Sequence, residues 1–301
     1  MTETPPRIAV CVVCRNEADK LPACLESARW ADEVIVMDLS SEDGSAEVAS
    51  SYGAHVLRHA PVAIVELVRN EAADAASAEW ILALDPDERI GHALPALLRE
   101  VSRRSDVDAV MIPVMNFDFG HPARTEVHRH DPKPRMYRKD RVRWPTLPNR
   151  LPPIPQDRVY HVPPRDELSL LHDRNRTIAE ALERAIRYAP AEAQALLDSG
   201  ETFTARKMVW EVMGKFYRQF VHARSLDEGV PGLVRGFVLA SFHFYVWACF
   251  WQLSGAQRTH RDDRYLRRFA IPLRLLEAAM IPGRARRWAA RQRRSSRQNL
   301  A

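Results

Sequence analysis

Short apolar runs and longer segments of helical periodicity alternate along the first 115 residues. Apolar runs bounded by polar residues are typical of strands covered on both faces, and single helices between them indicate βαβ units and a mostly parallel sheet. Strands are expected at Ile8–Cys14, Glu33–Asp38, His55–Arg58, Trp80–Leu84 and Ala109–Met115. Helices are expected at Asp19–Trp30, Asp43–Tyr52, Val65–Ala76 and His92–Ser105. The pattern predicts an α/β fold.

The pattern changes after Met115. Residues 116–170 are rich in Pro, His and Arg, with short strands expected at Arg135–Tyr137 and Val142–Trp144, whereas Pro145–Pro164 is too proline-dense for regular structure. Further helices are expected at Ile178–Tyr188, Ala191–Ser199, Phe203–Arg224 and Val230–Leu253. The last is long enough to span a bilayer, but Arg235 and His243 interrupt it. A buried or membrane-surface helix is therefore favoured over a spanning one.

These changes predict three parts: an α/β domain over residues 1–170, a helical extension over 171–257 and a basic tail over 258–301. The tail holds thirteen arginines and three acids, a net charge of +10 in a chain of net +5. Such a tail is either a solvated, disordered arm or a contact for an anionic membrane surface. No aromatic–basic interleaving or known motif supports nucleic acid as a partner.

Four cysteines without a disulfide framework, and a short polar N-terminus without an apolar signal segment, indicate a cytoplasmic protein.

The strand Trp80–Leu84 leads directly into the carboxylates of Asp85, Asp87 and Glu88. Open α/β sheets bind their ligands at the carboxyl ends of their strands. Two carboxylates on one turn suit a hard divalent cation, which keeps coordination positions for substrate phosphates. A second Asp-x-Asp, Asp106 and Asp108, precedes its apolar run and therefore lies at the wrong end of a strand.

Three more polar segments are expected at this edge of the sheet. Arg15-Asn16-Glu17 follows the first strand, Asp38 ends the second, and Arg69-Asn70 lies in the helix before Trp80. Asp38 could accept a hydrogen bond from a base N–H or a ribose hydroxyl. Arg69 could bind a phosphate bidentately or form a surface salt bridge. Neither Gly-x-Gly-x-x-Gly nor a Walker loop is present, which argues against dinucleotide and P-loop sites.

In order and spacing these segments resemble the family 2 glycosyltransferases with a GT-A fold, especially the group that includes lipopolysaccharide core glucosyl- and heptosyltransferases. The matching residues are Asn16-Glu17, Ser27–Glu33, Asp38–Ser45 and Asp85–Arg89, where Pro86 is the one departure from Asp-Ala-Asp-Glu-Arg. The resemblance continues more weakly through Arg135-Met136-Tyr137 and His172 into the helices up to Phe244.

The resemblance implies a metal-dependent and inverting transfer of a sugar from a nucleotide-diphosphate donor. The implied donor-binding residues are Arg15, Glu17, Asp38, Arg69, Asn70 and Asp85. Glu17 and Asp38 would hold the base and ribose, and Asp85 the ribose or the metal. Asp87 would ligate Mg²⁺ or Mn²⁺ across the diphosphate, so that Asp85 and Asp87 both act in catalysis.

The catalytic base is the least defined part of this hypothesis. Relatives of the group carry a His-Glu pair before the counterpart of His172, where this chain has Pro152–Gln156. His161 and Glu167 are the substitutes that we expect to be catalytic. Asp166, His128 and Asp131 are further candidates.

The expected protein is thus a cytoplasmic glycosyltransferase whose C-terminal helices and tail rest on the inner face of the membrane or form a homodimer contact. Its acceptor is an envelope glycan, a lipid-linked molecule or a natural product. Two alternatives stay open. A nucleotidyltransferase would share the sheet and the carboxylates but normally uses a Gly-rich or Lys-bearing loop after the first strand. A non-catalytic nucleotide-sugar-binding homologue would explain the missing His-Glu pair.

Overall fold

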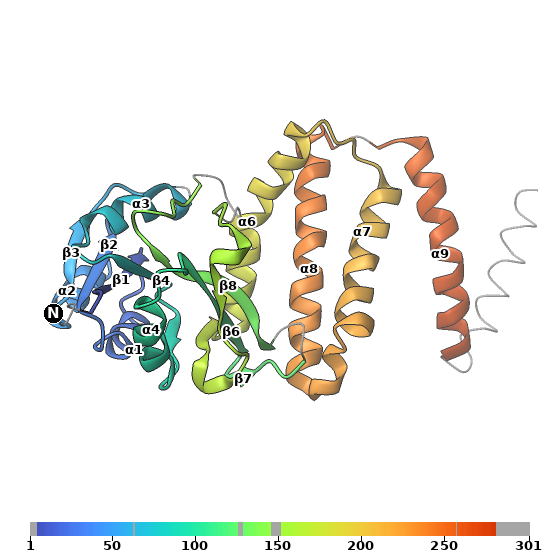
Figure 1. Ribbon diagram of the computed structural model, residues 1–301. Coiled ribbons are helices and arrows are strands. Elements are labelled where there is room, and N and C mark those ends of the chain that lie inside the picture. Colours follow the sequence, from blue (N-terminus) through green and yellow to red (C-terminus); the bar gives the residue numbers. More distant parts are fainter. Residues whose placement is uncertain (1–4, 63, 126–128, 146–151, 257, 281–301) are drawn as a thin grey trace, which may run out of the picture. The chain divides into compact units, whose positions relative to one another are not determined.

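The computed structural model describes residues 5–280 apart from 63, 126–128, 146–151 and 257 (Figure 1). The chain divides into two compact units. Unit 1 contains the chain up to Glu180 together with Ala223–Gly232, and unit 2 contains Ala181–His222 and the chain from Leu233 onward.

Unit 1 is built on one sheet with the strand order β3-β2-β1-β4-β8-β6-β10-β5, and β7 and β9 also pair with β6. The strands are β1 (Ile8–Cys14), β2 (Glu33–Asp38), β3 (His55–Arg58), β4 (Trp80–Leu84), β5 (Glu88–Ile90), β6 (Ala109–Asp118), β7 (His121–Pro122), β8 (Asp131–Arg138), β9 (Val159–His161) and β10 (Leu170–Asn175). The first four strands are parallel to one another, as expected. The sheet then becomes mixed, because β8 lies antiparallel between β4 and β6.

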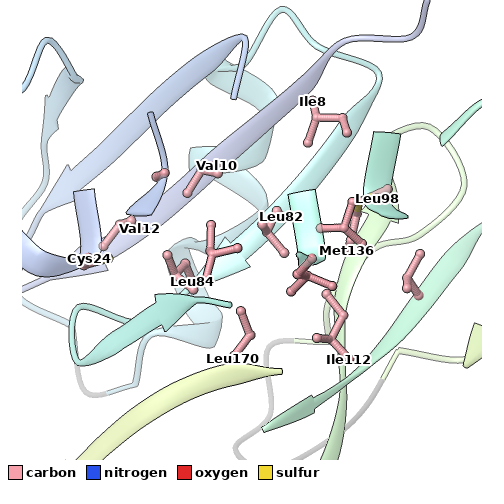
Figure 2. Packing of buried hydrophobic residues seen from close by; sticks show 14 of the residues in the cluster. Ile8, Val10, Val12, Cys24, Leu82, Leu84, Leu98, Ile112, Met136 and Leu170 are labelled. Atoms are coloured by element: carbon pink, nitrogen blue, oxygen red, sulfur yellow. The ribbon is translucent and has the colours of Figure 1, made fainter. Parts of the chain in front are cut away.

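Helices cover both faces of the sheet. They are α1 (Leu21–Ser27), α2 (Ser45–Ser51), α3 (Glu66–Ala75) and α4 (Leu94–Ser102), each within the range expected from the sequence. Successive strand residues point to opposite faces, so each central strand serves two cores. Val10, Val12 and Leu82 pack with Leu98 of α4 in one core (Figure 2). Ala9 and Ile81 pack with Val68 of α3 in the other. The α/β class is confirmed.

Three expectations for the middle of the chain were wrong or incomplete. Val142–Trp144 is not a strand; its backbone is bound by a side chain of α3, described below. The segment Pro145–Pro164 contains regular structure after all, a 3₁₀ turn at Gln156–Arg158 and β9. The short strands β5, β7 and β10 were not predicted. Their residues are mostly polar, so hydrophobic periodicity gives no signal for them.

The helical part also differs in detail. Instead of two helices, α6 is continuous over Ile178–Asp198 with Pro190 inside it. A proline removes one helical hydrogen bond, but the buried alanines recur every four residues through this point, so the packing stripe is unbroken. Those alanines are Ala181, Ala185, Ala189 and Ala193.

The next two helices are α7 (Ala205–Tyr217), followed by a π-helical turn at Arg218–His222, and α8 (Gly229–Leu253). In unit 2, Trp247 and Phe250 of α8 pack against Ala193 of α6. The start of the tail, expected to be a solvated arm or a surface contact, forms the helix α9 (His260–Met280). Residues 281–301 lie outside the described part of the chain.

One stretch of the described chain, Ser225–Leu253, is long and apolar enough to cross a membrane. Length and composition alone do not distinguish such a helix from a core helix.

The connection between α1 and β2 is fixed by Asp32, a residue of the family-like segment Ser27–Glu33. Its carboxylate accepts a hydrogen bond from the Ile8 backbone N–H at 2.7 Å and two from Arg99 at 2.5 and 2.9 Å. The Arg99 guanidinium is the main reason that the pKa of Asp32 is lowered from its usual value.

We expect Asp32→Asn to lower the free energy of unfolding by about 1 kcal/mol at neutral pH. Because the pKa is lowered in the folded state, this stabilisation is present above the ordinary pKa of 3.8 and disappears as pH falls through the lower folded pKa. Urea titrations of both proteins across that range should therefore converge at acidic pH. A difference that persists or grows there would contradict the assignment.

Candidate functional site

Three parallel strands bring the predicted site residues to one edge of the sheet. Cys14 at the end of β1 pairs with Asp38 at the end of β2, and Val12 pairs with Leu84 at the end of β4. The segments that follow these strands therefore begin side by side, and they carry Glu17, Asp38, Asp85 and Asp87. The second Asp-x-Asp precedes β6, and there Asp108 is bound by Arg158. The expected contrast between the two motifs is confirmed.

Asp85 is held between two arginines. Its Oδ1 lies 3.1 Å from a guanidinium nitrogen of Arg69, and its Oδ2 lies 2.7 Å from one of Arg135. Burial alone would raise the pKa of Asp85, but Arg135 and Arg69 outweigh it and hold that pKa well below its usual value. Asp85 is thus a fixed anion. Arg69 does form a salt bridge, but a largely buried one within the site and not the surface pair that the sequence left open.

Arg135 also binds Glu88, which is fully buried. The two ends of the Asp85–Glu88 turn are bonded to each other, because the Asp85 N–H donates to Glu88 Oε2 at 3.0 Å and the Glu88 N–H donates to the Asp85 carbonyl at 2.9 Å. Burial raises the pKa of Glu88 despite the neighbouring Arg135. Sequence reasoning gave neither residue a role, although Arg135-Met136-Tyr137 was part of the weaker resemblance.

Asp87 lies beside the imidazole of His172, a residue to which sequence reasoning assigned no role. Nε2 of His172 lies 3.5 Å from Oδ2 of Asp87, and its Nδ1 lies 2.8 Å from Oδ1 of Asn116. β10 places His172 opposite Glu88 on β5, and the Asp173 N–H donates to the Asp87 carbonyl at 2.8 Å. His172 is therefore a strand residue of the site.

The side chains around Asp87 suit a divalent cation that takes its remaining ligands from a substrate. Among the described residues, no group of three or more His, Cys, Asp or Glu side chains could hold a metal ion. Mg²⁺ and Mn²⁺ accept carboxylate oxygens and commonly use only one or two protein ligands beside phosphate oxygens, and Mn²⁺ also accepts imidazole nitrogen. Asp87 and His172 fit that requirement, whereas both carboxylate oxygens of Asp85 are bound by arginines.

Arg69 and Asn70 act through Trp144. The Arg69 guanidinium lies 5.1 Å from the centre of a Trp144 ring, a cation–π contact. The Asn70 amide donates to the Trp144 carbonyl at 2.8 Å and accepts from the Trp144 N–H at 3.0 Å. Asn70 thereby fixes an extended segment beside α3, and Arg69 is positioned between an aromatic ring and Asp85.

The first loop, Arg15–Lys20, and the second loop, Leu39–Gly44, are joined by hydrogen bonds. The Asn16 N–H donates to Ser41 Oγ at 2.9 Å, and Asn16 Oδ1 accepts from the Glu42 N–H at 2.8 Å. The Ala18 N–H donates to the Asp43 carboxylate at 2.9 Å. The Asp43 carboxylate also accepts from the Ser45 N–H at 3.0 Å, at the start of α2.

Three of the predicted donor residues lie in the first loop or at the end of β2. Asp38 is buried and accepts from the Ser41 N–H at 3.3 Å, Glu17 is half-buried and paired with Lys20 at 2.6 Å, and Arg15 is exposed. Asn16 and Ser40 both have left-handed backbone conformations, with φ of 55° and 56°. Residues without a glycine's freedom adopt this conformation when surrounding bonds enforce it, and such positions cluster at functional sites.

We expect Asn16→Ala to lower the free energy of unfolding by about 1–2 kcal/mol, because it removes a hydrogen bond and places alanine in the left-handed region. Asn16→Gly is the matched variant: it loses the same bond but tolerates the conformation. Urea denaturation should therefore rank the native protein above Asn16→Gly and Asn16→Ala last. Equal stability of the two variants would show that the backbone at residue 16 relaxes.

The candidate bases lie on later elements. His161 is exposed on β9, which pairs with β6 on the side opposite β8, so two strands separate it from β4. Glu167 lies in the 3₁₀ turn Asp166–Leu168, and its carbonyl accepts from the Ala93 N–H at 3.1 Å.

The further candidates are engaged elsewhere or lie outside the described residues. The Asp166 carboxylate binds Arg129 at 2.6 Å and the His130 imidazole at 3.1 Å. Asp131 pairs with Lys133 at 2.8 Å. His128 lies outside the described residues.

Several known proteins are similar to this chain in sequence. The lipopolysaccharide core biosynthesis glycosyltransferase LpsC of Rhizobium meliloti is 24% identical over 260 residues, which are 84% of this chain and 95% of that protein. An uncharacterized glycosyltransferase of Rickettsia felis is 22% identical over 254 residues, 79% of this chain and 87% of that protein. A TPR repeat-containing protein of Synechococcus elongatus is 38% identical over 85 residues, only 28% of this chain and 21% of that protein.

Solved structures resemble the chain more distantly. The mannosyltransferase PcManGT from Pyrobaculum calidifontis, in complex with GDP-Man and Mn²⁺, has a TM-score of 0.42 at 12% identity and covers 89% of this chain and 80% of its own. S. aureus TarS 1–349 has a TM-score of 0.43 at 14% identity and covers 83% and 90%.

The sequence model of glycosyl transferase family 2 matches residues 9–154. This range contains the joined loops after β1 and β2, the arginine-bound Asp85 and the metal-ligand candidate Asp87. The chain therefore carries a family 2 glycosyltransferase domain.

Proposed function

We propose that this enzyme moves a sugar from a nucleoside diphosphate donor to an acceptor hydroxyl, with inversion at the sugar carbon and with Mg²⁺ or Mn²⁺ at Asp87. The observation that carries the proposal is that the two carboxylates of Asp-x-Asp differ in their surroundings. Both oxygens of Asp85 are bound by arginines, while Asp87 lies beside His172. In this proposal Asp85 organises the site and Asp87 ligates the cation.

The chain's own residues have the following roles in this proposal. Glu17 and Asp38 accept hydrogen bonds from the base and ribose, on loops held together by Asn16. Arg69 and Asn70 position the Trp144 segment beside the donor. Asp87 and His172 hold the cation, which when bound neutralises charge that develops on the departing diphosphate.

The acceptor side of the proposed reaction needs a catalytic base. Inversion requires a base that removes the proton of the acceptor hydroxyl as it attacks the sugar carbon. His161 and Glu167 are the candidates carried forward from the sequence. The relative LpsC is named for lipopolysaccharide core biosynthesis, which supports an envelope glycan or a lipid-linked molecule as the acceptor. A small natural product is the other acceptor class.

A thermal-shift screen with UDP-, GDP-, ADP- and dTDP-sugars, each with and without Mn²⁺, tests the donor site. We expect one nucleotide series to raise the melting temperature only in the presence of metal, because binding to the folded state stabilises it. No shift with any donor would overturn the proposal. Slow metal-dependent release of the free sugar would separate a transferase from a non-catalytic binding homologue, which would bind the donor without turnover.

A further inference from the structure

An apolar stripe on α7 faces solvent in unit 2. Trp210, Met213, Tyr217 and Val221 recur at helical spacing across α7 and the π-turn that follows it. Trp210 and Tyr217 are 65% and 64% exposed, although tryptophan and tyrosine normally bury most of their rings. Exposed apolar patches of this kind on a folded unit mark surfaces that contact a partner or a membrane.

A second exposed stripe runs along α8 and borders the first. Leu233, Phe237 and Phe244 are exposed at heptad-like spacing, while Trp247 and Phe250 farther along the same helix are buried. Only 33% of the most apolar stretch within Ser225–Leu253 is buried.

Phe237 connects the two stripes. It is 53% exposed, yet its ring lies 5.4 Å from that of Phe216 and 5.2 Å from that of Phe220. Phe216 lies in α7 and Phe220 in the π-turn, each next to a residue of the α7 stripe. The two stripes therefore meet at the α7–α8 contact and form one surface, which we call the apolar ridge.

Basic side chains accompany the apolar ridge. Arg206 and Arg218 are exposed on α7 and its π-turn, where Arg206 lies one turn before Trp210 and Arg218 directly follows Tyr217. Packed against α7 is α9, whose described surface exposes Arg261, Arg264, Arg267 and Arg268. The two acids in the first turn of α9 are engaged locally, since Asp262 accepts from the Ala205 N–H at 2.8 Å and Asp263 from Arg258 at 2.9 Å.

We propose that the apolar ridge and the arginines of α9 form a binding surface for an anionic phospholipid bilayer. Aromatic rings suit the boundary between headgroups and acyl chains, and arginines attract the negative surface of such a membrane. A second copy of the chain is the less favourable occupant, because it would bring the same basic side chains together. The inference goes beyond sugar transfer and places the enzyme at a membrane surface.

Binding at the surface is favoured over spanning for a reason within α8. Arg235 is almost completely buried inside the protein, and Trp247 and Phe250 pack against α6. One side of α8 is therefore covered by other parts of the protein. Only its exposed side is available to lipid. A helix that presents one apolar side beside basic residues lies in the plane of the interface.

Co-sedimentation of the full chain with vesicles tests the proposal without donor or metal, so its result is separate from that of the donor screen. We expect binding to phosphatidylcholine vesicles that contain phosphatidylglycerol, little binding to phosphatidylcholine alone, and release at high salt. The double variant Trp210→Ser, Tyr217→Ser should weaken binding at least tenfold. The double variant Arg264→Gln, Arg267→Gln should weaken binding to the anionic vesicles selectively.

Leu67→Ser is the matched control, since Leu67 is an exposed apolar residue of unit 1, and it should bind as the native chain does. Unchanged melting temperatures of the variants would show that they remain folded. The proposal is overturned if anionic vesicles are not bound, if the ridge variants bind normally, or if the chain resists extraction by high salt and alkaline carbonate. A dimer in solution that the ridge variants dissociate, without vesicle binding, would assign the ridge to a second copy instead.

Discussion

Replacing Arg135 with methionine is expected to lower the free energy of unfolding by about 3–5 kcal/mol, as is typical when one partner of a buried ion pair is removed. Arg135 is only 8% exposed and binds Asp85 and the fully buried Glu88. Without it, Glu88 must either remain charged in a low-dielectric interior or take up a proton. Urea denaturation at neutral pH measures the loss directly.

The surface pair of Arg143 with Asp74 provides the control. Its nitrogen–oxygen distance of 2.5 Å is similarly short, but both side chains are 53% exposed. Arg143→Met should therefore cost no more than about 1 kcal/mol. The double variant Arg135→Met, Glu88→Gln should be more stable than Arg135→Met alone, because the orphaned charge is gone. If Arg135→Met and Arg143→Met had equal effects, burial would not govern the Arg135 pair.

The common position of the proposed donor-binding residues was predictable because its information is local. Each of Glu17, Asp38 and Asp85 lies at or just beyond the end of a strand that the hydrophobic pattern identifies. Parallel pairing then brings the ends of β1, β2 and β4 to one edge. The same reasoning excluded Asp108, which precedes its strand and is bound by Arg158.

The charged centre of the site was not predictable in this way. Arg135 reaches Asp85 and Glu88 only because β8 inserts antiparallel between β4 and β6, which reverses the direction expected of a parallel sheet. His172 reaches Asp87 because β10 pairs with the three-residue strand β5. Both contacts depend on which strands pair, and in which direction, between segments far apart in the chain, and hydrophobic periodicity carries no signal for that choice.

Asn70 shows a different limit of sequence reasoning. Its position beside Arg69 predicted a place near the donor. In the structure its side-chain amide both donates to and accepts from the backbone of Trp144. An exposed loop asparagine and an asparagine that fixes another segment look the same in sequence. Only the tertiary partner distinguishes them, and here that partner lies in a segment that was predicted to be a strand and is not one.

Asp87→Asn is expected to reduce turnover of the donor by a factor on the order of 10³, comparable to the loss of one preorganised group that stabilises developing charge. The amide keeps the size of the side chain but removes the negative charge that a divalent cation requires. Asp87 belongs to a turn whose backbone is fixed by Asp85 and Glu88, so the fold should be retained. Turnover is measured as release of the nucleoside diphosphate at saturating Mn²⁺.

The control for Asp87→Asn comes from the second Asp-x-Asp of the same chain. Asp106 precedes β6 and is paired with Arg104 at 2.6 Å on the surface, so Asp106→Asn changes the same chemistry at the wrong end of a strand. Turnover should be unaffected by this variant. If the Asp87 variant lost the metal-dependent thermal shift as well as turnover, the defect would lie in cation binding. Loss of turnover with the shift intact would instead place the cation elsewhere, and Asp87 would act on the donor directly.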